Sequence, residues 1–348
     1  MASDRLYLDH AATTPMLPAA KAAMIEALEN WSNPSSPHSD GRAARAALEE
    51  ARRRIGAALG WEGQIVFTSG ASEAIAIALT RAKADRVLTS PVEHDSVLRV
   101  TPNVGRLDVD PDGILIRHSS TDGQDGAKTI LAIQHVNNET GVIQPLDAIA
   151  REGVILFADC AQSAAKLPLP QADMMAISAH KFGGPPGIGA LLIKDLGLIH
   201  PSGGQEQGYR AGTENLPAVL AMAAALEART DWLHRAAALR AKLDAAIEDH
   251  GGQIVARNAP RMPAIASYRM PGLSARAQLI QFDLAGISVS AGSACSSGSL
   301  KTSHVLHAMG WDEVQAGEVI RVSFGPMTGE VDIDRFIAQW TKMAERAR

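Results

Sequence analysis

The sequence predicts an α/β protein with a mostly parallel sheet flanked by helices and a smaller C-terminal α+β domain. Helical and strand patterns alternate through the first two thirds of the 348 residues. The predicted strands are short and almost continuously apolar, which is typical of strands buried on both faces of a sheet. After about residue 249 the pattern changes to shorter mixed segments. A chain of this length is long for one hydrophobic core, which favours two domains.

The individual elements follow from hydrophobic periodicity and from the turn residues between the apolar runs. Helical spacing predicts helices over 18–30, 41–59 and 71–84, and an Ala-rich segment predicts one long helix, intact or broken, over 215–249. Apolar runs bounded by turn residues predict strands over 64–69, 86–90, 129–136, 154–159, 174–179 and 189–193. The smaller domain is indicated by the segments 264–270, 277–286, 288–292 and 319–324 and by a final helix.

The bulk composition argues against several classes of protein. A net charge of −5 and a pI of about 6.1 do not suit a nucleic-acid-binding surface. No apolar run reaches the roughly 18 residues of a membrane span, and the N-terminus lacks the pattern of a secretory signal. Cys160 and Cys295 are the only cysteines, so neither a disulfide framework nor a structural zinc site is expected, and the expected location is a reducing cytoplasm.

Residues that follow the predicted strands come first in the search for a site, because open parallel sheets bind ligands at the carboxyl ends of their strands. After the strand 64–69, small residues lead into a helix at Ala71 and Ser72. Backbone N–H groups at such a helix start can seat a phosphate. The alternative is that Ser69 or Ser72 only caps the helix.

Two further strands end in polar residues. His94 follows the strand 86–90, where a lone histidine is either functional or a structural residue with its own partners. Asn137, Asn138 and Glu139 follow the strand 129–136. The alternative to a functional role is a turn, since Asn and the Gly that comes after them favour turns.

The strands 154–159 and 174–179 are followed by the most informative residues. Asp159 ends the first strand, and a buried carboxylate there needs a cationic or hydrogen-bonding partner such as a protonated ring nitrogen. Gln162 lies about one turn further on. Lys181 follows the second strand, beside a loop rich in glycine and proline, so we expect it to face the same pocket as Asp159. Burial lowers the pKa of a lysine, which suits Schiff-base chemistry.

These groups fit one cofactor, pyridoxal 5'-phosphate. That cofactor needs a lysine for its aldehyde, an acid at its ring nitrogen and a seat for its phosphate. Lys181, Asp159 and the helix start at Ala71 would supply the three, and Ser178 and His180 flank the lysine as further phosphate donors. The cofactor would remove the cost of burying the lysine, and the nearby glycines would let the backbone approach it closely.

A second informative stretch surrounds Cys295, which lies among Gly, Ser and Ala before a helix expected near Leu300. These surroundings favour a mobile thiol over a buried apolar filler, which is the usual role of a cysteine. Cys160 directly follows a buried strand and is predicted to be structural.

Two observations concern basic residues further along. Arg321 lies inside an apolar strand and needs a carboxylate, either as a structural ion-pair partner or as a ligand. His304 and His307 have helical spacing but no third ligand nearby, so they predict a polar helix face and not a metal site.

A series of motifs identifies a family that this chain resembles. The motifs occur in this order along nearly the whole chain: YLDHAATTP, NPSSPHSDGR, VFTSGASEA, EHDSV, HVNNETGVIQP, ADCAQSAAKLP, SAHKFGGPPGIGAL, GGQEQGYRAGTEN, GSACSSGSLKTSHVL and IRVSFGPMTGEVDID. Together they resemble the cysteine desulfurases of the class V aminotransferase group, most of all the NifS/IscS type. The resemblance implies the fold type I of PLP-dependent transferases. It implies a large PLP-binding domain over 12–235 and a small domain, formed by 1–11 and 236–348, that carries the catalytic cysteine loop.

The resemblance also implies a role for each matching residue. Lys181 would bind the cofactor and move protons, His94 would stack on its ring, and Cys295 would be the nucleophile. Arg321 would hold the substrate carboxylate, and Thr213 would reach the phosphate bound by the neighbouring subunit of a homodimer. The other implied contacts are those of Asn138 with the cofactor and the substrate carboxylate, Asp159 with the ring nitrogen, Gln162 with the ring hydroxyl, and Ala71, Ser72, Ser178 and His180 with the phosphate.

The implied reaction converts L-cysteine to L-alanine and leaves the sulfur on Cys295 as a persulfide. An acceptor protein, such as an iron–sulfur scaffold or a thiolation enzyme, would then take the sulfur, without a membrane or a nucleic acid as direct partner. Gln207, Pro326 and Ile75 depart from the family pattern, which affects the expected subunit contacts and acceptor docking but not the catalytic set.

Three alternatives remain open at this point. A selenocysteine lyase or another PLP-dependent β-lyase would have the same fold. An ordinary aminotransferase would have no use for a mobile cysteine. A non-catalytic binding paralogue would not need Lys181, Asp159, His94 and Cys295 together.

Overall fold

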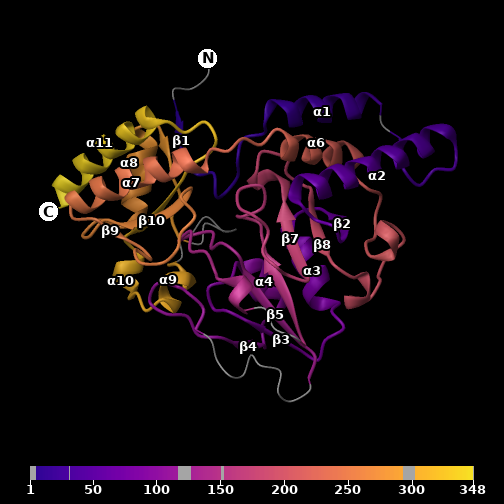
Figure 1. Ribbon diagram of the computed structural model, residues 1–348. Coiled ribbons are helices and arrows are strands. Elements are labelled where there is room, and N and C mark those ends of the chain that lie inside the picture. The colour runs from indigo at the N-terminus through magenta and orange to yellow at the C-terminus, as the bar shows by residue number, and fades with distance from the viewer. Residues whose placement is uncertain (1–4, 31, 117–126, 150–152, 293–301, 348) are drawn as a thin grey trace.

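The computed structural model of the chain describes residues 5–30, 32–116, 127–149, 153–292 and 302–347. Figure 1 shows a large sheet with helices on both faces and, beside it, a smaller group of strands and helices that includes the C-terminus. None of the helices in these ranges combines the length and the apolar character that crossing a membrane requires.

The large sheet forms the floor on which the site is built. Its seven described strands lie in the order β2-β8-β7-β6-β5-β3-β4, and all neighbouring pairs are parallel except those that involve β8. The prediction of a mostly parallel sheet is therefore confirmed, although the reversed direction of β8 was not predicted. The strands are β2 (Gln64–Thr68), β3 (Arg86–Thr89), β4 (Gly105–Arg106), β5 (Thr129–Gln134), β6 (Val154–Asp159), β7 (Met174–Ser178) and β8 (Gly189–Ile193).

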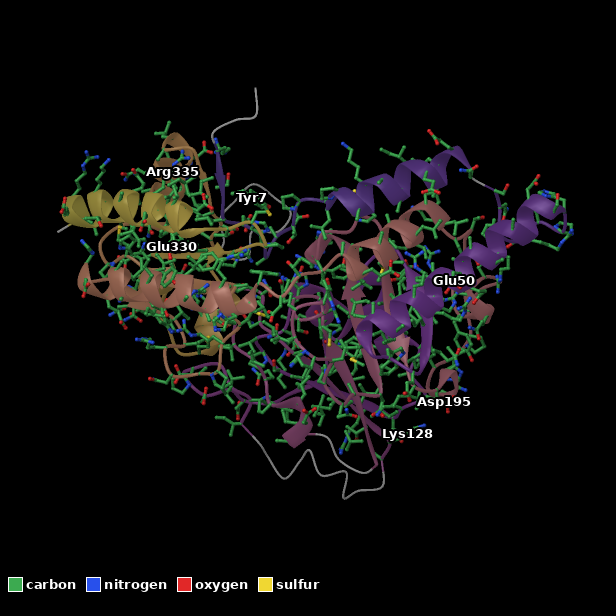
Figure 2. All side chains as sticks on the ribbon, turned by 45° about the horizontal axis from the view of Figure 1, so that its top comes forward. Tyr7, Glu50, Lys128, Asp195, Glu330 and Arg335 are labelled. Carbon is green, nitrogen blue, oxygen red and sulfur yellow. The ribbon has the colours of Figure 1, made fainter. Side chains whose placement is uncertain are left out.

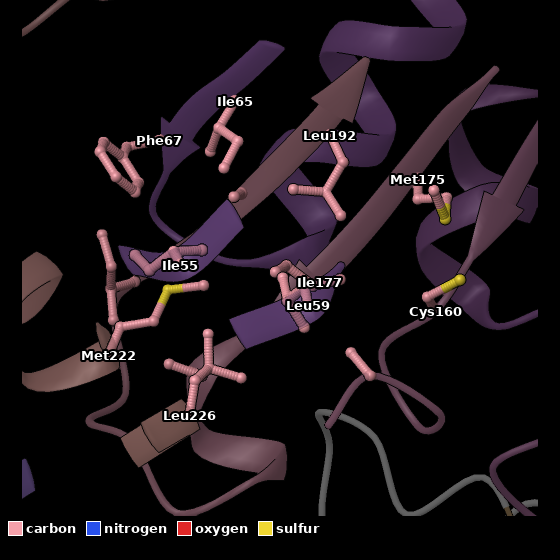
Figure 3. Packing of buried hydrophobic residues seen from close by; sticks show 14 of the residues in the cluster. Ile55, Leu59, Ile65, Phe67, Cys160, Met175, Ile177, Leu192, Met222 and Leu226 are labelled. Atoms are coloured by element: carbon pink, nitrogen blue, oxygen red, sulfur yellow. The ribbon is translucent and has the colours of Figure 1, made fainter. Parts of the chain in front are cut away.

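Helices bury both faces of this sheet. On one face, α2 (Ser39–Leu59) and α6 (Leu216–Glu227) pack their apolar side chains onto β2, β7 and β8, as Figure 3 shows for Met222 and Leu226. α1 (Pro18–Glu29) packs against α6 on the same side. On the other face lie α3 (Ala71–Thr80) and α4 (Asp95–Val100), with Ile75 and Val97 in the core there. Residues of β5, β6, β7 and β8 are buried throughout, which explains why their sequences are continuously apolar.

A second core lies in the smaller group of elements. An antiparallel sheet of β9 (Gln253–Ile254), β10 (Ile265–Arg269) and β12 (Val319–Ser323) packs against α7 (Leu233–Asp249) and α11 (Glu330–Ala347). α8 (Ala275–Leu284) joins the same core through Phe282, whose ring stacks on Phe336. β1 (Leu6–Tyr7), near the N-terminus, pairs in parallel with β11 (Ile287–Ser288); Tyr7 is labelled in Figure 2. The short helices α5 (Leu146–Ile149), α9 (His304–Ala308) and α10 (Glu313–Ala316) complete the described elements other than 3-10 turns.

Three predicted helices differ from the structure by more than two residues at a boundary or by a break. The helix predicted over 71–84 ends at Thr80, because Ala82 already pairs with Ile199 in an isolated β-bridge. The segment 215–249 is broken into two helices, the alternative that its sequence left open, because α6 belongs to the first core and α7 to the second. The helix expected near Leu300, a residue outside the described ranges, begins at His304. The domain boundary between 235 and 236 stays a prediction.

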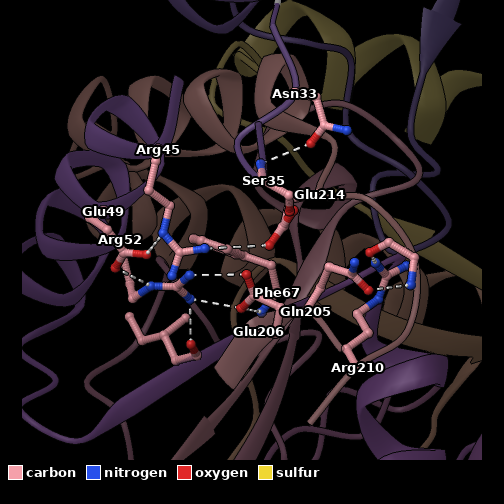
Figure 4. A network of polar contacts seen from close by, with 12 residues as sticks. Asn33, Ser35, Arg45, Glu49, Arg52, Phe67, Gln205, Glu206, Arg210 and Glu214 are labelled. Atoms are coloured by element: carbon pink, nitrogen blue, oxygen red, sulfur yellow. Dashed lines mark hydrogen bonds and ion pairs between the residues drawn. The ribbon is translucent and has the colours of Figure 1, made fainter. Parts of the chain in front are cut away.

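A buried ion pair fixes the turn at Glu206 to the large sheet (Figure 4). The Glu206 carboxylate accepts hydrogen bonds from Nη1 and Nη2 of Arg52, at 2.8 and 3.0 Å, and from the backbone N–H of Phe67 at 2.8 Å. The Arg52 guanidinium also lies 4.5 Å from the centre of the Phe67 ring. Glu206 and Gln207 have φ values of +46° and +58°, a left-handed conformation that costs non-glycine residues about 1–2 kcal/mol each. The ion pair therefore holds a strained turn in place.

We predict that Glu206→Ala destabilises the chain by about 3–5 kcal/mol, because it removes the buried bidentate partner of Arg52 and the acceptor of the Phe67 N–H, and leaves Arg52 only the half-exposed carboxylate of Glu49. The free energy of unfolding in urea measures this loss. The matched control is Glu227→Ala, since Glu227 pairs with Arg54 where both side chains are at least one third exposed, and an exposed pair contributes only about 0–1 kcal/mol. Equal losses in the two variants would contradict the prediction.

Candidate active site

A cavity of about 520 Å³ lies at the carboxyl ends of β5, β6 and β7, next to the second core. Gln134, Asp159 and Ser178, which end these three strands, all line it. The cavity brings together ten of the predicted site residues: Ala71, Ser72, His94, Asn138, Asp159, Gln162, Ser178, His180, Lys181 and Arg321.

Two predicted site residues are not among those that line the cavity. Thr213 is exposed and lies elsewhere, so its assigned contact with the phosphate of a neighbouring subunit stays a prediction. Cys295 lies outside the described residues.

Lys181 is placed by the end of β7, where the chain enters a short 3-10 turn at Ala179–Lys181. Its amine donates hydrogen bonds to the backbone carbonyls of Ala11 and Ala12, at 2.7 and 2.9 Å. Gly183, two residues further on, has a φ of +86°, and a Cβ atom there would lie 2.6 Å from the Leu17 side chain. The predicted approach of glycine backbone to the lysine stays a prediction. The amine is thus held at the cavity wall by acceptors that carry no charge.

Asp159 presents a carboxylate from the end of β6. The backbone N–H of Ala161 donates to its Oδ1 at 2.9 Å, and within the described part of the chain its Oδ2 accepts no hydrogen bond. Burial raises the pKa of Asp159, while the hydrogen bond from Ala161 and the positive charges of His94 and Lys181 oppose this effect. A cationic group in the cavity would stabilise its ionised form.

Glu93 is a second buried carboxylate close to Asp159, and it was not among the predicted site residues. It accepts hydrogen bonds from the Ser90 hydroxyl at 2.6 Å and from the backbone N–H of Gln134 at 2.7 Å. Burial raises the pKa of Glu93 to about 8, and the negative charge of Asp159 contributes to the rise. Glu93 is therefore mostly neutral at pH 7. Its place immediately before His94 in a polar stretch after a strand was the signal available in the sequence.

His94 has a structural role and also lies at the cavity, so its functional role stays a prediction. Its Nδ1 accepts a hydrogen bond from the backbone N–H of Ser96 at 3.1 Å and so caps α4. The same ring lines the cavity. Burial lowers the pKa of His94, so its neutral form is favoured. In that form the capping contact makes Nδ1 the acceptor and puts the proton on Nε2.

Within the described ranges, the start of α3 has free backbone donors of the kind that the predicted anion seat requires. The residue that caps α3 is Gly70, without a side-chain hydrogen bond, so capping by Ser69 or Ser72 is not observed. Among the described residues, no acceptor takes the backbone N–H groups of Ala71 and Ser72. Ser178 lines the same part of the wall, since its Oγ would lie 3.5 Å from a Cβ atom on Gly70. These donors suit a phosphate.

The remaining polar atoms also fit pyridoxal phosphate. Gln162 donates its amide N–H to the carbonyl of Ala11 at 2.8 Å, and its Oε1 is buried without a partner in the described ranges. Burial lowers the pKa of Lys166 to about 7 and that of His180 to about 4, with the Lys181 charge as a further cause in both. The wall thus offers one lysine amine, one carboxylate with an unused oxygen and several N–H donors, which is the set that this cofactor requires.

Arg321 extends from β12 to the cavity and has a carboxylate partner there. Its Nη2 donates to Oδ1 of Asp9 at 2.8 Å, its Nη1 donates to the carbonyl of Asn138 at 3.0 Å, and its Nε is buried without an acceptor in the described ranges. A structural ion pair was one of the two predicted roles of Arg321, and this pair is observed. Asp9 was not among the predicted site residues, although it follows a short apolar run just as the other site residues do.

The two histidines near Cys295 separate in the structure. His304 lines the cavity and its Nε2 lies 2.9 Å from the carbonyl of Glu93, so it is not simply part of an exposed polar face. His307 pairs with Glu313 at the surface. No cluster of possible metal ligands occurs among the residues that the structure describes.

Cys160 and the three departures from the family pattern have clear places. Cys160 is completely buried in the first core, where burial raises the pKa of its thiol, as its structural assignment requires. Ile75 is buried and lines the cavity. Gln207 lies in the strained turn described above, and the carbonyl of Pro326 accepts a hydrogen bond from Arg235.

Comparisons with known proteins agree with this geometry. The family model described as aminotransferase class-V matches residues 6–336. A cysteine desulfurase of Cereibacter sphaeroides is 33% identical, with 99% of this chain and 97% of that protein covered. The cysteine desulfurase IscS of Dictyoglomus turgidum is 34% identical, with 99% and 95% covered. An IscS-like cysteine desulfurase of Mycobacterium tuberculosis is also 34% identical, with 98% and 97% covered.

Solved structures show the same relationship. A NifS-like protein from Rickettsia africae superposes with a TM-score of 0.89 at 30% identity, covering 98% of this chain and 99% of the other. A structure of SspA in complex with cysteine gives a TM-score of 0.77 at 27% identity, with 93% and 100% covered. Together with the whole-length sequence matches, these similarities place the chain in the class-V aminotransferase family, among the cysteine desulfurases of the NifS/IscS type.

Proposed function

We propose that this protein is a pyridoxal-phosphate-dependent cysteine desulfurase that converts L-cysteine to L-alanine and holds the released sulfur on Cys295 as a persulfide. The observation that carries the proposal is the single cavity wall that presents Lys181, Asp159, His94 and Arg321 together. Each has the chemistry that its assigned role requires. Relatives named cysteine desulfurase along the whole chain, and a related protein solved with cysteine, support the substrate.

The cofactor would be held at its three polar ends. The start of α3, with Ser178 and His180, would hold the phosphate, and Asp159 would pair with the ring nitrogen. Gln162 lies beside Asp159 for the ring hydroxyl, and Lys181 would bind the aldehyde carbon. When bound, pyridoxal phosphate supplies an electron-accepting ring that stabilises negative charge on the substrate α-carbon.

The residues of the chain would then divide the work on the substrate. Arg321 and Asn138 bind the α-carboxylate and so orient the α-proton toward Lys181, whose amine removes it. His94, which lines the cavity, would lie against the cofactor ring and move a proton at its Nε2. Burial lowers the pKa of His94, which favours the neutral imidazole for this transfer.

Sulfur transfer balances with the thiolate of Cys295 as the nucleophile. The thiolate attacks the substrate sulfur, an S–S bond forms and the bond between sulfur and the β-carbon breaks. The electron pair of that bond stays on the β-carbon, which takes a proton and becomes the methyl group of alanine. The S–H proton of the substrate stays on the terminal sulfur of the persulfide, so the step needs no oxidant.

We further propose that the enzyme is a cytoplasmic homodimer that passes its sulfur to an acceptor protein, for iron–sulfur clusters or for thiolated products. Thr213 supports the dimer because it is exposed beside the turn that Glu206 anchors. A second subunit placed there would bring Thr213 to the neighbouring phosphate seat.

We predict that Cys295→Ala abolishes alanine formation from L-cysteine while cofactor binding is retained. A turnover assay with a reductant, which follows alanine and sulfide, tests this. The matched control is Cys160→Ala, which removes the other, completely buried thiol and should leave alanine and sulfide in equal amounts. Turnover that survives Cys295→Ala would sink the persulfide mechanism.

We predict that Lys181→Ala loses the visible absorption of the bound cofactor and its reduction by borohydride. The amine of this residue is the one that the backbone carbonyls of Ala11 and Ala12 hold at the cavity wall. Lys194→Ala is the control, because Lys194 also follows a strand but pairs with Asp173 at the surface. A borohydride-reducible chromophore in Lys181→Ala would exclude this lysine.

We predict that Arg321→Ala raises the KM for cysteine by at least about tenfold, the effect of losing one charge-assisted interaction of roughly 1.4 kcal/mol or more. Cofactor affinity, measured by absorption, should change much less. Arg321→Lys, which keeps the charge but not the fork of N–H donors, should fall between the wild type and Arg321→Ala. An unchanged KM for cysteine would contradict a carboxylate-binding role.

A further inference from the structure

The arginine assigned to the substrate carboxylate already binds a carboxylate of its own chain. Asp9 accepts from Nη2 of Arg321 at 2.8 Å while Asn138 accepts from Nη1. The third donor, Nε, is buried and not accessible to a ligand. An incoming carboxylate therefore has to share the two terminal nitrogens with Asp9 or replace it.

Asp9 is the more exposed member of this ion pair. Its side chain is 20% exposed and that of Arg321 is 8% exposed, and both line the cavity. A ligand that enters the cavity can thus reach the Asp9 carboxylate as readily as the arginine behind it. Two carboxylates that share one guanidinium repel each other, which weakens the binding of the newcomer.

The other four described acids of the cavity wall form no hydrogen bond or ion pair with Arg321. Asp159 accepts a hydrogen bond from the backbone N–H of Ala161. Glu73 pairs with Arg210, and Asp95 pairs with Arg99. Glu139 accepts from the Ser303 hydroxyl. Among the described residues that line the cavity, Asp9 is therefore the acid that contacts Arg321.

The backbone of Asp9 is fixed, so an exchange needs only a rotation of its side chain. Its carbonyl accepts hydrogen bonds from the backbone N–H of Ala12 at 3.0 Å and from the Tyr7 hydroxyl at 3.1 Å. Asp9 also forms an isolated parallel bridge with Ser323, at the end of β12. The carboxylate can move off Arg321 and return to it while the chain around it stays in place.

We propose that Asp9 is an internal competitor for the carboxylate seat on Arg321, which weakens the binding of amino acids there and so promotes the release of alanine. This inference rests on the proposed function. Alanine keeps the α-carboxylate and the α-amine of cysteine and lacks only the sulfur. An arginine without a competitor would hold product as firmly as substrate, whereas Asp9 takes back the guanidinium as the carboxylate leaves.

The test is an equilibrium titration of the holoenzyme with L-alanine, followed by the visible absorption of the bound cofactor, and it needs no turnover. Asp9→Asn keeps an oxygen acceptor for Nη2 but removes the charge. In Asp9→Asn the dissociation constant for alanine should fall by about five- to tenfold. This factor corresponds to the removal of a competitor whose interaction is as strong as one partly exposed ion pair. The KM for cysteine should fall with it.

The control is Asp283→Asn, which removes the same charge from an ion pair with Arg5 outside the cavity and should leave alanine binding unchanged. Retained cofactor absorption and a cooperative melting transition above the assay temperature show that Asp9→Asn is folded. An unchanged or larger dissociation constant in that variant would overturn the proposal, and a larger one in both Asp9→Asn and Asp9→Ala would mean that Asp9 only orients Arg321.

The outcome is distinguishable from a failure of the proposed function. If the wild type forms no alanine from cysteine, the proposed reaction fails whatever the titration shows. If the wild type forms alanine but Asp9→Asn binds alanine no more tightly, only the competition is wrong.

Discussion

The site depends on the hydrogen bonds that residues 9–14 make to it. This segment leaves the small sheet at β1 and crosses the carboxyl ends of the large sheet. The carbonyls of Ala11 and Ala12 accept from the Lys181 amine, and the backbone N–H of Thr14 donates to the carbonyl of His180. At its other end, Asp9 binds Arg321 from the second core. One short segment thus sets the spacing between the lysine and the arginine, and this spacing must match an amino acid substrate.

Electrostatics in the cavity is arranged so that few charges remain without a partner. Glu93 is buried beside Asp159, and its raised pKa leaves it mostly neutral, so it adds no second full negative charge next to that carboxyl group near pH 7. Lys166 and His180 are likewise shifted toward their neutral forms near Lys181. Three acids of the cavity wall, Glu73, Asp95 and Asp9, pair with arginines of the chain itself.

Much of the site could be predicted from the sequence, because one rule locates it. Parallel strands end at the same edge of a sheet, so Asp159 and Lys181 had to meet once their strands were recognised. This rule does not locate Asp9, because Asp9 follows β1, a strand of two residues that pairs with β11, far along the chain. Local pattern cannot supply such a partner. The raised pKa of Glu93 is likewise set by tertiary burial and by Asp159, which no local pattern shows.

The features of the fold that the sequence left open or did not predict have the same origin. The helices α6 and α7 are both Ala-rich, so the break between them has no strong local signal and follows from their membership of different cores. The sequence of β8 is an apolar run like those of its parallel neighbours, so nothing in it indicates the reversed direction of this strand. In each case the decisive contact joins residues that are distant in sequence.

The central claim is that the sulfur of cysteine moves to Cys295, and mass spectrometry tests it most directly. The holoenzyme is mixed with one equivalent of L-cysteine without reductant, quenched, digested and mapped. The account predicts that the peptide containing Cys295 gains the mass of one sulfur atom while the peptide containing Cys160 does not. Alanine formed with no added sulfur on Cys295, or with the sulfur on Cys160, would contradict it.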